Sequence, residues 1–320
     1  MTMKELAKLA NVSIATVSKA FCDADDVSED TKNHIFDIAK ETGCFGKYYK
    51  GKYSKKIIAI ICPELKSNYY TCFVEELQSL IEKAGCMPVI STDGFSLAKQ
   101  AELIEYYASF LKVDGILVFG MKCDLKKGYE TPIVSLFSCE DSKVDSVDVS
   151  FESAMKEGVK LLTELGHRDI VFIGEKLTTG KETLYREIIR KYGKTPPVTV
   201  QSDYRFEKAG EDGISRLLSD NIPFTAVICA YDNIAFGTIK QLKRQGLKVP
   251  DDVSVIGMDN IHIGEYTETA LTTIDTNPRE VCMVAWNLLQ TKLKNPYYLS
   301  RQNIEIGAGL VIRESTGIAK

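Results

Sequence analysis

Hydroxyl and basic side chains gather at helical spacing near the start of the chain, in the stretch LAKLANVSIATVSKAF that covers residues 6–21. Ser13 is a good N-cap for a short helix over 14–21, in which Val17 faces inward. The side chains on the opposite face are Ile14, Ala15, Ser18 and Lys19. A hydroxyl such as that of Thr16 can donate to a phosphate oxygen, and a long cation can reach a base edge. These residue types in this pattern therefore suit contact with nucleic acid.

Two further helices are predicted to position this one. Thr2 and Glu5 form a capping box ahead of an apolar stripe. Ser28 announces a third helix, which Gly43 ends. The set predicts a helix-turn-helix over residues 1–46, whose second helix would enter the major groove of DNA. A small helical cap with no role on DNA needs the same stripes and turns, so it remains the alternative at this point.

The charge distribution limits where nucleic acid could bind. The chain has a net charge of −4, and residues 1–46 hold five lysines against eight acidic residues. Residues 47–56, KYYKGKYSKK, hold five lysines and no acid. This balance argues against a protein that coats nucleic acid non-specifically, and it confines the basic footprint to one short linker.

Other kinds of chemistry lack their residues. The nine cysteines are scattered, odd in number and free of any CxxC pair, so we expect reduced thiols rather than disulfides or a zinc site. The three histidines have no metal-ligand spacing. GxSxG, GxGxxG and P-loop motifs are missing, so hydrolase, dinucleotide and nucleoside-triphosphate functions have no signature here. We therefore expect no metal, no cofactor and no catalytic residue.

The first residues, MTMKELAKLA, do not read as a signal peptide, because no apolar core follows a basic start. No later apolar run approaches the ~20 residues that span a bilayer. We expect a cytoplasmic protein without membrane contact.

After the lysine segment, short β-rich runs alternate with amphipathic helical stretches. The candidate strands include IIAIIC (57–62), GILVF (115–119), PIVSLF (132–137), DIVFIG (169–174), TAVICA (225–230) and VSVIGM (253–258). Alternation of this kind predicts parallel sheets covered by helices. About a dozen such elements exceed one small sheet. The predicted fold class is therefore α/β, with two doubly wound subdomains that face a cleft.

Several segments resemble the LacI/GalR family of bacterial transcription regulators. MTMKELAKLANVSIATVSKAF with VSEDTKNHIFDIAKETG is similar to the DNA-binding headpiece of that family. ELGHRDIVFIG, DNIAFGTIKQLKRQGLKVPDDVSVIGMDNI and LTTID are similar to segments of its core. The resemblance covers nearly the whole chain in the right order. It implies a homodimer that binds a pseudo-palindromic operator in double-stranded DNA, and we expect a repressor.

The resemblance also implies a core similar to periplasmic binding proteins, which holds a small effector such as a sugar or another metabolite. The implied domains are a helix-turn-helix over 1–46, a linker or hinge over 47–56, and an effector-binding and dimerisation core over 57–320. The core subdomains are about 57–150 plus 277–296, and 151–276 plus 297–320.

Pattern and resemblance together give a set of expected DNA contacts. The set is Thr2, Ser13, Ile14, Ala15, Thr16, Ser18, Lys19, Lys47, Lys50, Lys52 and Tyr53. Lys19 stands where arginine is common, which replaces a bidentate fork by a point charge. In the linker, Gly46 stands at the family's proline and Tyr53 at the leucine that wedges into the minor groove. The altered linker disfavours a hinge helix and favours salt-sensitive phosphate contact by its lysines.

In the core, the family's effector cleft suggests seven residues. They are Tyr70, Thr71, Lys181, Tyr204, Tyr231, Asp232 and Asp259. Tyr204 is expected to stack on the ligand, while Lys181 and Asp259 are expected to hold its polar end from opposite sides, near the carboxyl ends of strands. Asp232 has the alternative role of capping the helix that follows it. Phe137 stands where many sugar-responsive members have aspartate, which favours an aromatic-lined pocket for a planar or less polar ligand.

Two other functions stay open from the sequence. The core alone would also suit a metabolite-binding protein without a role on DNA, although the capped headpiece argues against it. An enzyme using the same cleft would need an acid, base or nucleophile set that the sequence does not supply.

Overall fold

The computed structural model describes residues 1–320 except 23, 50–54, 122–128, 138, 140–143 and 296–299. The chain divides into a helical unit, Met1–Ile57 with Gly85–Met87, and a larger α/β unit, Ile58–Ala84 with Pro88–Lys320. Three of the expected DNA contacts, Lys50, Lys52 and Tyr53, lie outside the described residues.

The helical unit begins with three helices whose caps are those predicted. Its helices are α1 (Met3–Leu9), α2 (Ile14–Phe21), α3 (Glu29–Glu41) and α4 (Phe45–Tyr48). Thr2 and Glu5 form the reciprocal capping box of α1. Ser13 Oγ accepts the Thr16 amide at 3.0 Å, and Ser28 likewise caps α3. The three predicted helix starts are therefore confirmed.

Aromatic rings of α3 and α4 form a cluster in this unit. The rings of Phe45 and Tyr49 stack with centroids 4.7 Å apart, and Phe36 meets both edge-on. Tyr48 donates a hydrogen bond to the Met1 carbonyl oxygen at 2.8 Å. Helix α4 thus spans the point between residues 46 and 47 at which the sequence analysis ends the helix-turn-helix.

The α/β unit contains two six-stranded sheets. The first has the order β11-β5-β4-β3-β1-β2. Its strands are β1 (Ile57–Cys62), β2 (Met87–Thr92), β3 (Gly115–Phe119), β4 (Ile133–Leu136), β5 (Asp145–Ser150) and β11 (Asn303–Gly307). Its helices are α5 (Asn68–Lys83), α6 (Leu97–Glu105), a π-helix (Tyr106–Leu111) and α11 (Pro278–Lys294). We call this part the first lobe.

The second sheet has the order β12-β10-β9-β8-β6-β7. Its strands are β6 (Ile170–Glu175), β7 (Val198–Ser202), β8 (Ala226–Cys229), β9 (Ser254–Met258), β10 (Thr272–Asp275) and β12 (Gly309–Val311). Its helices are α7 (Glu152–Glu164), α8 (Thr179–Tyr192), α9 (Glu207–Ser219), α10 (Asp232–Arg244), and two 3-10 turns (Lys176–Thr178 and His262–Glu265). We call this part the second lobe. Only β12 runs antiparallel to its neighbour among the pairings described in this sheet.

Each of the six predicted strands is present, in a central position or flanking the centre of its sheet. Their residues are buried almost throughout, as in β3 and β9, which are buried at every position. Strands covered by helices on both faces need such continuous apolar runs. In the described part of the chain, no helix combines the length and the apolar character needed to cross a membrane.

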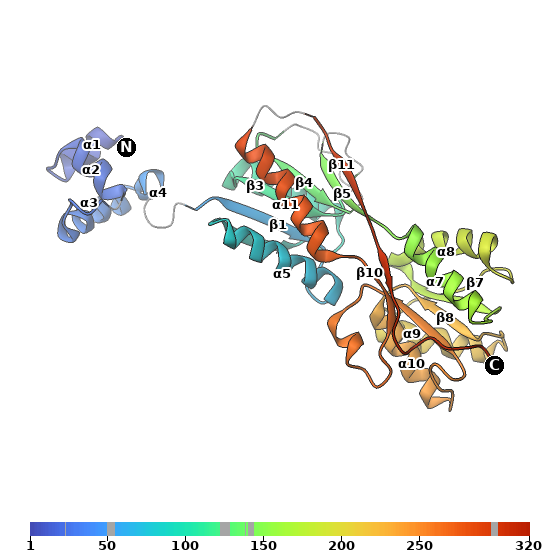
Figure 1. Ribbon diagram of the computed structural model, residues 1–320. Helices are drawn as coiled ribbons and strands as arrows, with labels where there is room; N and C mark the ends of the chain where they lie inside the picture. Colours follow the sequence, from blue (N-terminus) through green and yellow to red (C-terminus); the bar gives the residue numbers. More distant parts are fainter. Residues whose placement is uncertain (23, 50–54, 122–128, 138, 140–143, 296–299) are drawn as a thin grey trace. The chain divides into compact units, whose positions relative to one another are not determined.

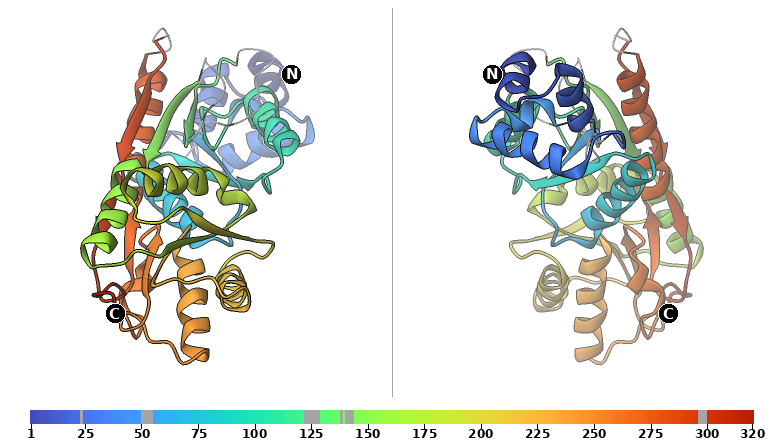
Figure 2. Two further views of the ribbon diagram at one scale, coloured as in Figure 1. Left: turned by 90° about the vertical axis from the view of Figure 1, so that its right-hand side faces the viewer. Right: turned by 90° about the vertical axis from the view of Figure 1, so that its left-hand side faces the viewer.

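The chain passes between the lobes three times: from β5 to α7, from β10 to α11, and from β11 to β12. The third passage is seen in Figures 1 and 2 as a long ribbon that leaves the first sheet and enters the second. Residues 303–307 pair in parallel with β5. The expected assignment of this segment to the second subdomain is therefore wrong, and the crossing falls near Ala308. The short sequence NIEIG alternates apolar and exposed positions, so no apolar run marked it as a strand.

Candidate functional site

A cavity of about 550 Å³ lies between the two lobes. Residues at the carboxyl ends of strands from both sheets line it. Those of the first lobe include Pro63, Asp93, Phe119 and Phe137, and those of the second include Glu175, Arg205, Tyr231 and Asp259. Open parallel sheets bind ligands at this edge, and the volume lies within the usual range for small-molecule sites.

Aromatic rings form much of the cavity wall. The lining rings are Tyr69, Tyr70, Phe95, Phe119, Phe137, Phe151, Phe206 and Tyr231. Tyr69 and Phe137 stack with centroids 5.5 Å apart and planes 24° apart. This wall agrees with the aromatic pocket expected from Phe137. Flat apolar faces of this kind suit a planar ring better than a polyol.

Four lining residues have positive φ angles that side-chain-bearing residues rarely adopt. The φ angles are 62° at Phe95, 67° at Phe137, 57° at Phe206 and 111° at Asp259. Such strain persists only where the surrounding structure enforces it, and it gathers at functional sites. Each of the four residues follows a strand by one to four positions and lines the cavity.

Lys181 and Asp259 line the cavity together, but not from opposite sides. Both belong to the second lobe, and Lys181 Nζ lies 3.5 Å from Asp259 Oδ1. The expectation of opposite walls is wrong because α8 starts beside the end of β6, in the same sheet as β9. Lys181 also donates to the Ala230 carbonyl oxygen at 2.8 Å and lies over the Phe151 ring at 4.7 Å.

The surroundings of this pair set its charge. Burial raises the pKa of Asp259 to about 6, although the Lys181 ammonium opposes the shift. Asp259 Oδ1 is buried and accepts no hydrogen bond from any described residue. The carboxylate can therefore accept a hydrogen bond from a ligand without breaking one inside the protein.

Asp232 lies behind the cavity wall rather than on it. Its carboxylate accepts the Ile261 amide at 2.8 Å and the Thr273 hydroxyl at 2.6 Å, and the residue is fully buried. Burial first, and the nearby Asp259 second, raise its pKa to about 8. A Cβ at Gly257 would lie 2.2 Å from Asp232 Oδ1, so only glycine fits there. The carboxylate ties the β9 loop to β10, whereas the helix-capping alternative finds no side-chain cap at α10.

Besides Asp232, two of the expected effector contacts, Thr71 and Tyr204, do not line the cavity. Tyr204 is 53% exposed, with its amide bonded to Ser202 Oγ at 3.1 Å. Thr71 bonds back to the carbonyl oxygens of its own helix turn. Tyr70 and Tyr231 do line the cavity. Tyr231 accepts the Phe206 amide at its hydroxyl, 2.9 Å away, and so fixes the loop after β7.

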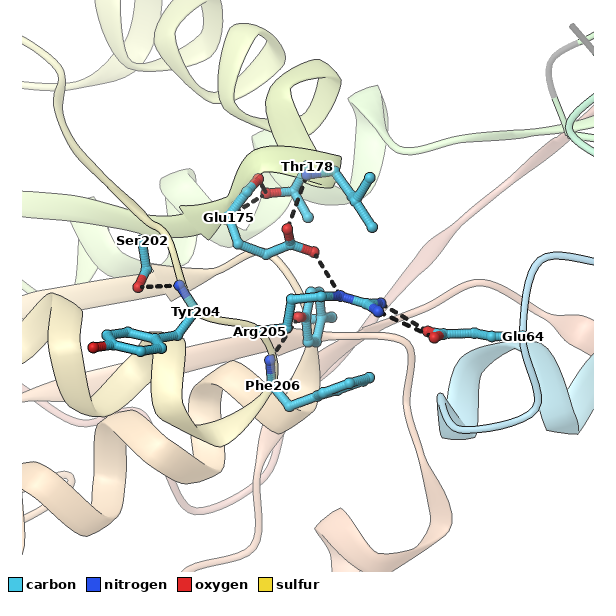
Figure 3. A network of polar contacts seen from close by, with 9 residues as sticks. Glu64, Glu175, Thr178, Ser202, Tyr204, Arg205 and Phe206 are labelled. Carbon is cyan, nitrogen blue, oxygen red and sulfur yellow. Dashed lines mark hydrogen bonds and ion pairs between the residues drawn. The ribbon is translucent and has the colours of Figure 1, made fainter. Parts of the chain in front are cut away.

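That loop supplies a cavity residue that the sequence analysis missed. Arg205 binds Glu64 of the first lobe through both terminal nitrogens, at 2.7 and 3.0 Å, and its Nε lies 3.7 Å from Glu175 Oε1 (Figure 3). Glu175 ends β6, and its other oxygen accepts the Leu177 amide at 2.9 Å. The rule that polar residues after parallel strands gather at one edge would have selected both residues.

The second candidate site is the outward face of α2 in the helical unit. Ile14, Ala15 and Lys19 are exposed, while Val17 is fully buried, as predicted. Thr16 and Ser13 share a hydrogen bond between their hydroxyls at 2.8 Å. Lys19 is paired with Asp26, from the loop between α2 and α3.

The remaining expected DNA contacts in the described chain have local roles. Ser18 is partly buried beside Lys19 on α2. Thr2 is exposed at the start of α1, where its side chain makes the cap. The ammonium of Lys47 lies 5.3 Å from the centre of the Tyr48 ring.

His167 is a buried structural residue, hydrogen-bonded to Thr225 and to the Gly317 carbonyl oxygen. The described residues contain no cluster of three side chains able to ligate a metal.

Two protein-family models match the chain, one in the helical unit and one in the α/β unit. The family model described as bacterial regulatory proteins, lacI family, matches residues 2–44, and a model described as periplasmic binding protein-like domain matches residues 159–316. The HTH-type transcriptional repressor CytR of Escherichia coli strain K12 is 29% identical over 331 residues, covering 98% of this chain and 96% of CytR. The HTH-type transcriptional repressor PurR of Vibrio campbellii is 28% identical over 333 residues, covering 98% of each.

Solved structures agree on the fold. The lac repressor dimer bound to operator and the anti-inducer ONPF superposes with a TM-score of 0.76 at 20% identity, covering 99% of each chain. A complex of the transcriptional regulator CelR with cellobiose gives a TM-score of 0.67 at 21% identity, covering 98% of this chain and 99% of CelR. The relatives match along nearly the whole chain. The chain therefore combines a helix-turn-helix unit of the lacI family with a periplasmic-binding-protein-like core, and it is a homologue of the transcriptional repressors CytR and PurR.

Proposed function

We propose that this regulator is a repressor that binds a pseudo-palindromic operator as a homodimer and is controlled by a small effector in the cleft between its lobes. The observation that carries the proposal is the pairing, in one chain, of a capped helix with an exposed reading face and a cleft built at the strand ends of two sheets. The repressors CytR and PurR, similar along 98% of this chain, support the DNA-binding part.

The effector is a planar compound with at least one hydrogen-bond donor. Aromatic rings from both lobes offer it flat faces, and Asp259 Oδ1, which is ion-paired with Lys181 but accepts no hydrogen bond from a described residue, offers it an acceptor. Lys181 neutralises that carboxylate and positions it. The solved relative CelR is described with cellobiose, so the same fold also accommodates a sugar; the aromatic wall here is our reason to favour a planar ring.

Two assays test this function. DNA fragments selected from a random library by the full-length protein should share a two-fold-symmetric sequence, and a thermal-shift screen of nucleosides, sugars and amino acids should find a compound that raises the melting temperature. The same compound should change the affinity for the selected DNA, because an effector must bind two states of the protein differently. Enrichment of no sequence at all would overturn the DNA-binding proposal.

Lys181→Ala tests whether the compound acts through the cleft, and Lys160→Ala is its matched control. The substitution should abolish stabilisation by the compound and its effect on DNA affinity, while the affinity for DNA without the compound stays near that of the wild type. Lys160→Ala, on the exposed surface of α7, removes a lysine that pairs only with Glu164 at 3.6 Å among the ion pairs described. This variant should keep both responses.

A further inference from the structure

The pair of Arg205 and Glu64 joins the two lobes at the cavity, which Arg205 lines. Arg205 belongs to the loop after β7, and Glu64 to the loop after β1. The guanidinium meets the carboxylate in a two-bond fork, at 2.7 and 3.0 Å. Both side chains are shielded, with exposed fractions of 34% for Arg205 and 17% for Glu64. A fork of this geometry is the one arginine uses to bind the carboxylate or phosphate of a ligand.

A second carboxylate and two rings flank the rest of the guanidinium, although its Nε donates no hydrogen bond to a described residue. Its Nε lies 3.7 Å from Glu175 Oε1, and the group lies over Phe206 at 4.6 Å and Phe95 at 5.3 Å. The cation therefore faces two carboxylates and two rings, as Figure 3 shows for the carboxylates. An approaching anion would find one positive group whose charge is already matched by the chain.

The charges on the cavity wall repeat this balance. Among the described lining residues, four are carboxylates (Asp93, Asp148, Glu175 and Asp259) and two are cations (Lys181 and Arg205). Lys181 is paired with Asp259, and Arg205 with Glu64. An anionic ligand must displace a protein carboxylate from one of these cations, and it meets the repulsion of the remaining acids. An uncharged ligand meets neither cost.

We propose that Glu64 occupies the anion-binding fork of Arg205 and thereby makes the cleft selective for ligands without a negative charge. The chain itself supplies the anion that bridges the lobes, so their contact needs no phosphate or carboxylate from the ligand. Glu64 is then a specificity-determining residue although it makes no contact with the ligand. The inference rests on the proposed effector cleft and narrows its ligand class to uncharged planar compounds, such as nucleosides rather than nucleotides.

The test compares each uncharged compound with its own phosphate. The four ribonucleosides, ribose and their 5′-phosphates are titrated into full-length protein, and apparent dissociation constants are taken from the rise in melting temperature. In the wild type every phosphate should bind at least ~10-fold more weakly than its parent compound or not at all. In Glu64→Gln the phosphates should gain ~10- to 100-fold, because a freed guanidinium can bind them through charge-assisted hydrogen bonds.

Two controls separate the fork from a general change of charge. Glu211→Gln removes a carboxylate that pairs with Lys240 at 2.7 Å and Arg244 at 3.3 Å away from the cavity wall, and it should leave the phosphates weak. The double variant Glu64→Gln with Arg205→Gln should lose the gain, because the fork is gone. A structural role of Glu64 alone would weaken parent compounds and phosphates equally.

The inference is wrong if a wild-type phosphate binds as tightly as its parent, and equally if no phosphate gains affinity in the folded Glu64→Gln variant. The wild-type comparison needs no substitution, so it decides the question even if that variant does not fold. Failure of the proposed DNA-binding function would be seen in a different experiment, the selection of DNA fragments by the wild-type protein. The phosphate series does not depend on that assay.

Discussion

Lys19 stands on the reading face of α2 and is paired with Asp26 from the neighbouring loop. Both side chains are more than half exposed, and pairs of this kind contribute little to stability because water screens them. A good contact with a base edge is worth ~1–3 kcal/mol, which is enough for Lys19 to exchange Asp26 for DNA. We therefore expect the acidic partner to oppose DNA binding only weakly.

Substitutions at these two positions should act in opposite directions. Lys19→Ala should weaken binding to the selected operator ~10-fold or more, through loss of the long cation from the major groove. Asp26→Asn should strengthen binding a few-fold, because Lys19 no longer has a competing partner. Fluorescence anisotropy with labelled operator measures both. Asp25→Asn is the matched control for charge alone, and an equal gain in this variant would contradict a specific role of Asp26.

The buried Asp232 predicts how stability depends on pH. Its pKa is raised to about 8 in the folded protein, against an ordinary value of 3.8. Between these values the folded state holds a proton that the unfolded chain has released, so the free energy of unfolding falls as the pH rises and levels off above about 8. Urea unfolding at a series of pH values should show this decline, and Asp232→Asn should flatten it between pH 6 and 8.

Asp259 accounts for part of the same trend at lower pH, because its pKa is raised only to about 6. Some decline between pH 4 and 6 should therefore remain in Asp232→Asn. Asp252→Asn serves as a control, since hydrogen bonding to the Lys248 amide lowers the pKa of this exposed carboxyl and its titration ends below the window. An unaltered slope in Asp232→Asn would show that another group carries the proton.

At the level of residues, the sequence predicted the position of the site in the chain better than it predicted which side chains line the cavity. Tyr70, Lys181, Tyr231 and Asp259 line the cavity, yet Tyr204 turns out to solvent while Arg205 and Phe206 turn inward. Which of three neighbouring side chains faces a cleft depends on the backbone, here on φ of 57° at Phe206. Neither a pattern nor a resemblance carries that angle. The pairing of Arg205 with Glu64 joins residues 141 positions apart, and only the folded chain brings them together.

Among the elements, the sequence found those with strong local signals. Helix starts with hydroxyl caps and strands with continuous apolar runs are both present as predicted. The strands it missed are half-exposed or polar, as in β2, β7 and β11. The missed β10 is buried but begins with two threonines, Thr272 and Thr273, whose hydroxyls are satisfied by other parts of the chain. Burial of polar residues by distant partners leaves no periodic signature.

The linker gives a prediction at this scale, and most of it lies outside the described residues. Changing Lys50, Lys52 and Lys55 together to Gln should flatten the dependence of log affinity on log salt, since each engaged phosphate contributes about −0.9 to the slope. Preference for the selected operator should persist, and Tyr53→Ala should have the smaller effect. Titrations of operator and unrelated DNA at several salt concentrations measure both quantities. A large loss of preference in Tyr53→Ala, with an unchanged slope in the triple variant, would point to a tyrosine wedge in the minor groove.

For the molecule as a whole, the acidic balance of residues 1–46 favours paired reading of DNA over binding by a single headpiece. When two weakly binding headpieces are linked in a dimer, binding of the first raises the effective concentration of the second at its half-site. Dimers of this motif bind half-sites that lie one helical turn apart, or a multiple of one turn. We therefore expect that scrambling one half of the selected operator reduces affinity more than tenfold. Gel shifts with the intact and half-scrambled duplexes test this, and equal affinities would mean that one headpiece suffices.

The interleaving of the lobes also orders events during synthesis on the ribosome. Ser146 of β5 bonds to Asn303 of β11, 157 residues later, and between them lie all of the second lobe except β12 and the last residues of the chain. At roughly 5–20 residues per second, the edge of β5 waits about 8–30 seconds for its neighbour. During that interval five strands of the second sheet can assemble while the first sheet still exposes an open edge. The nascent first lobe, although it is begun earlier, thus waits for most of the second lobe to be synthesised, and its open edge is where a chaperone would find an unpaired strand.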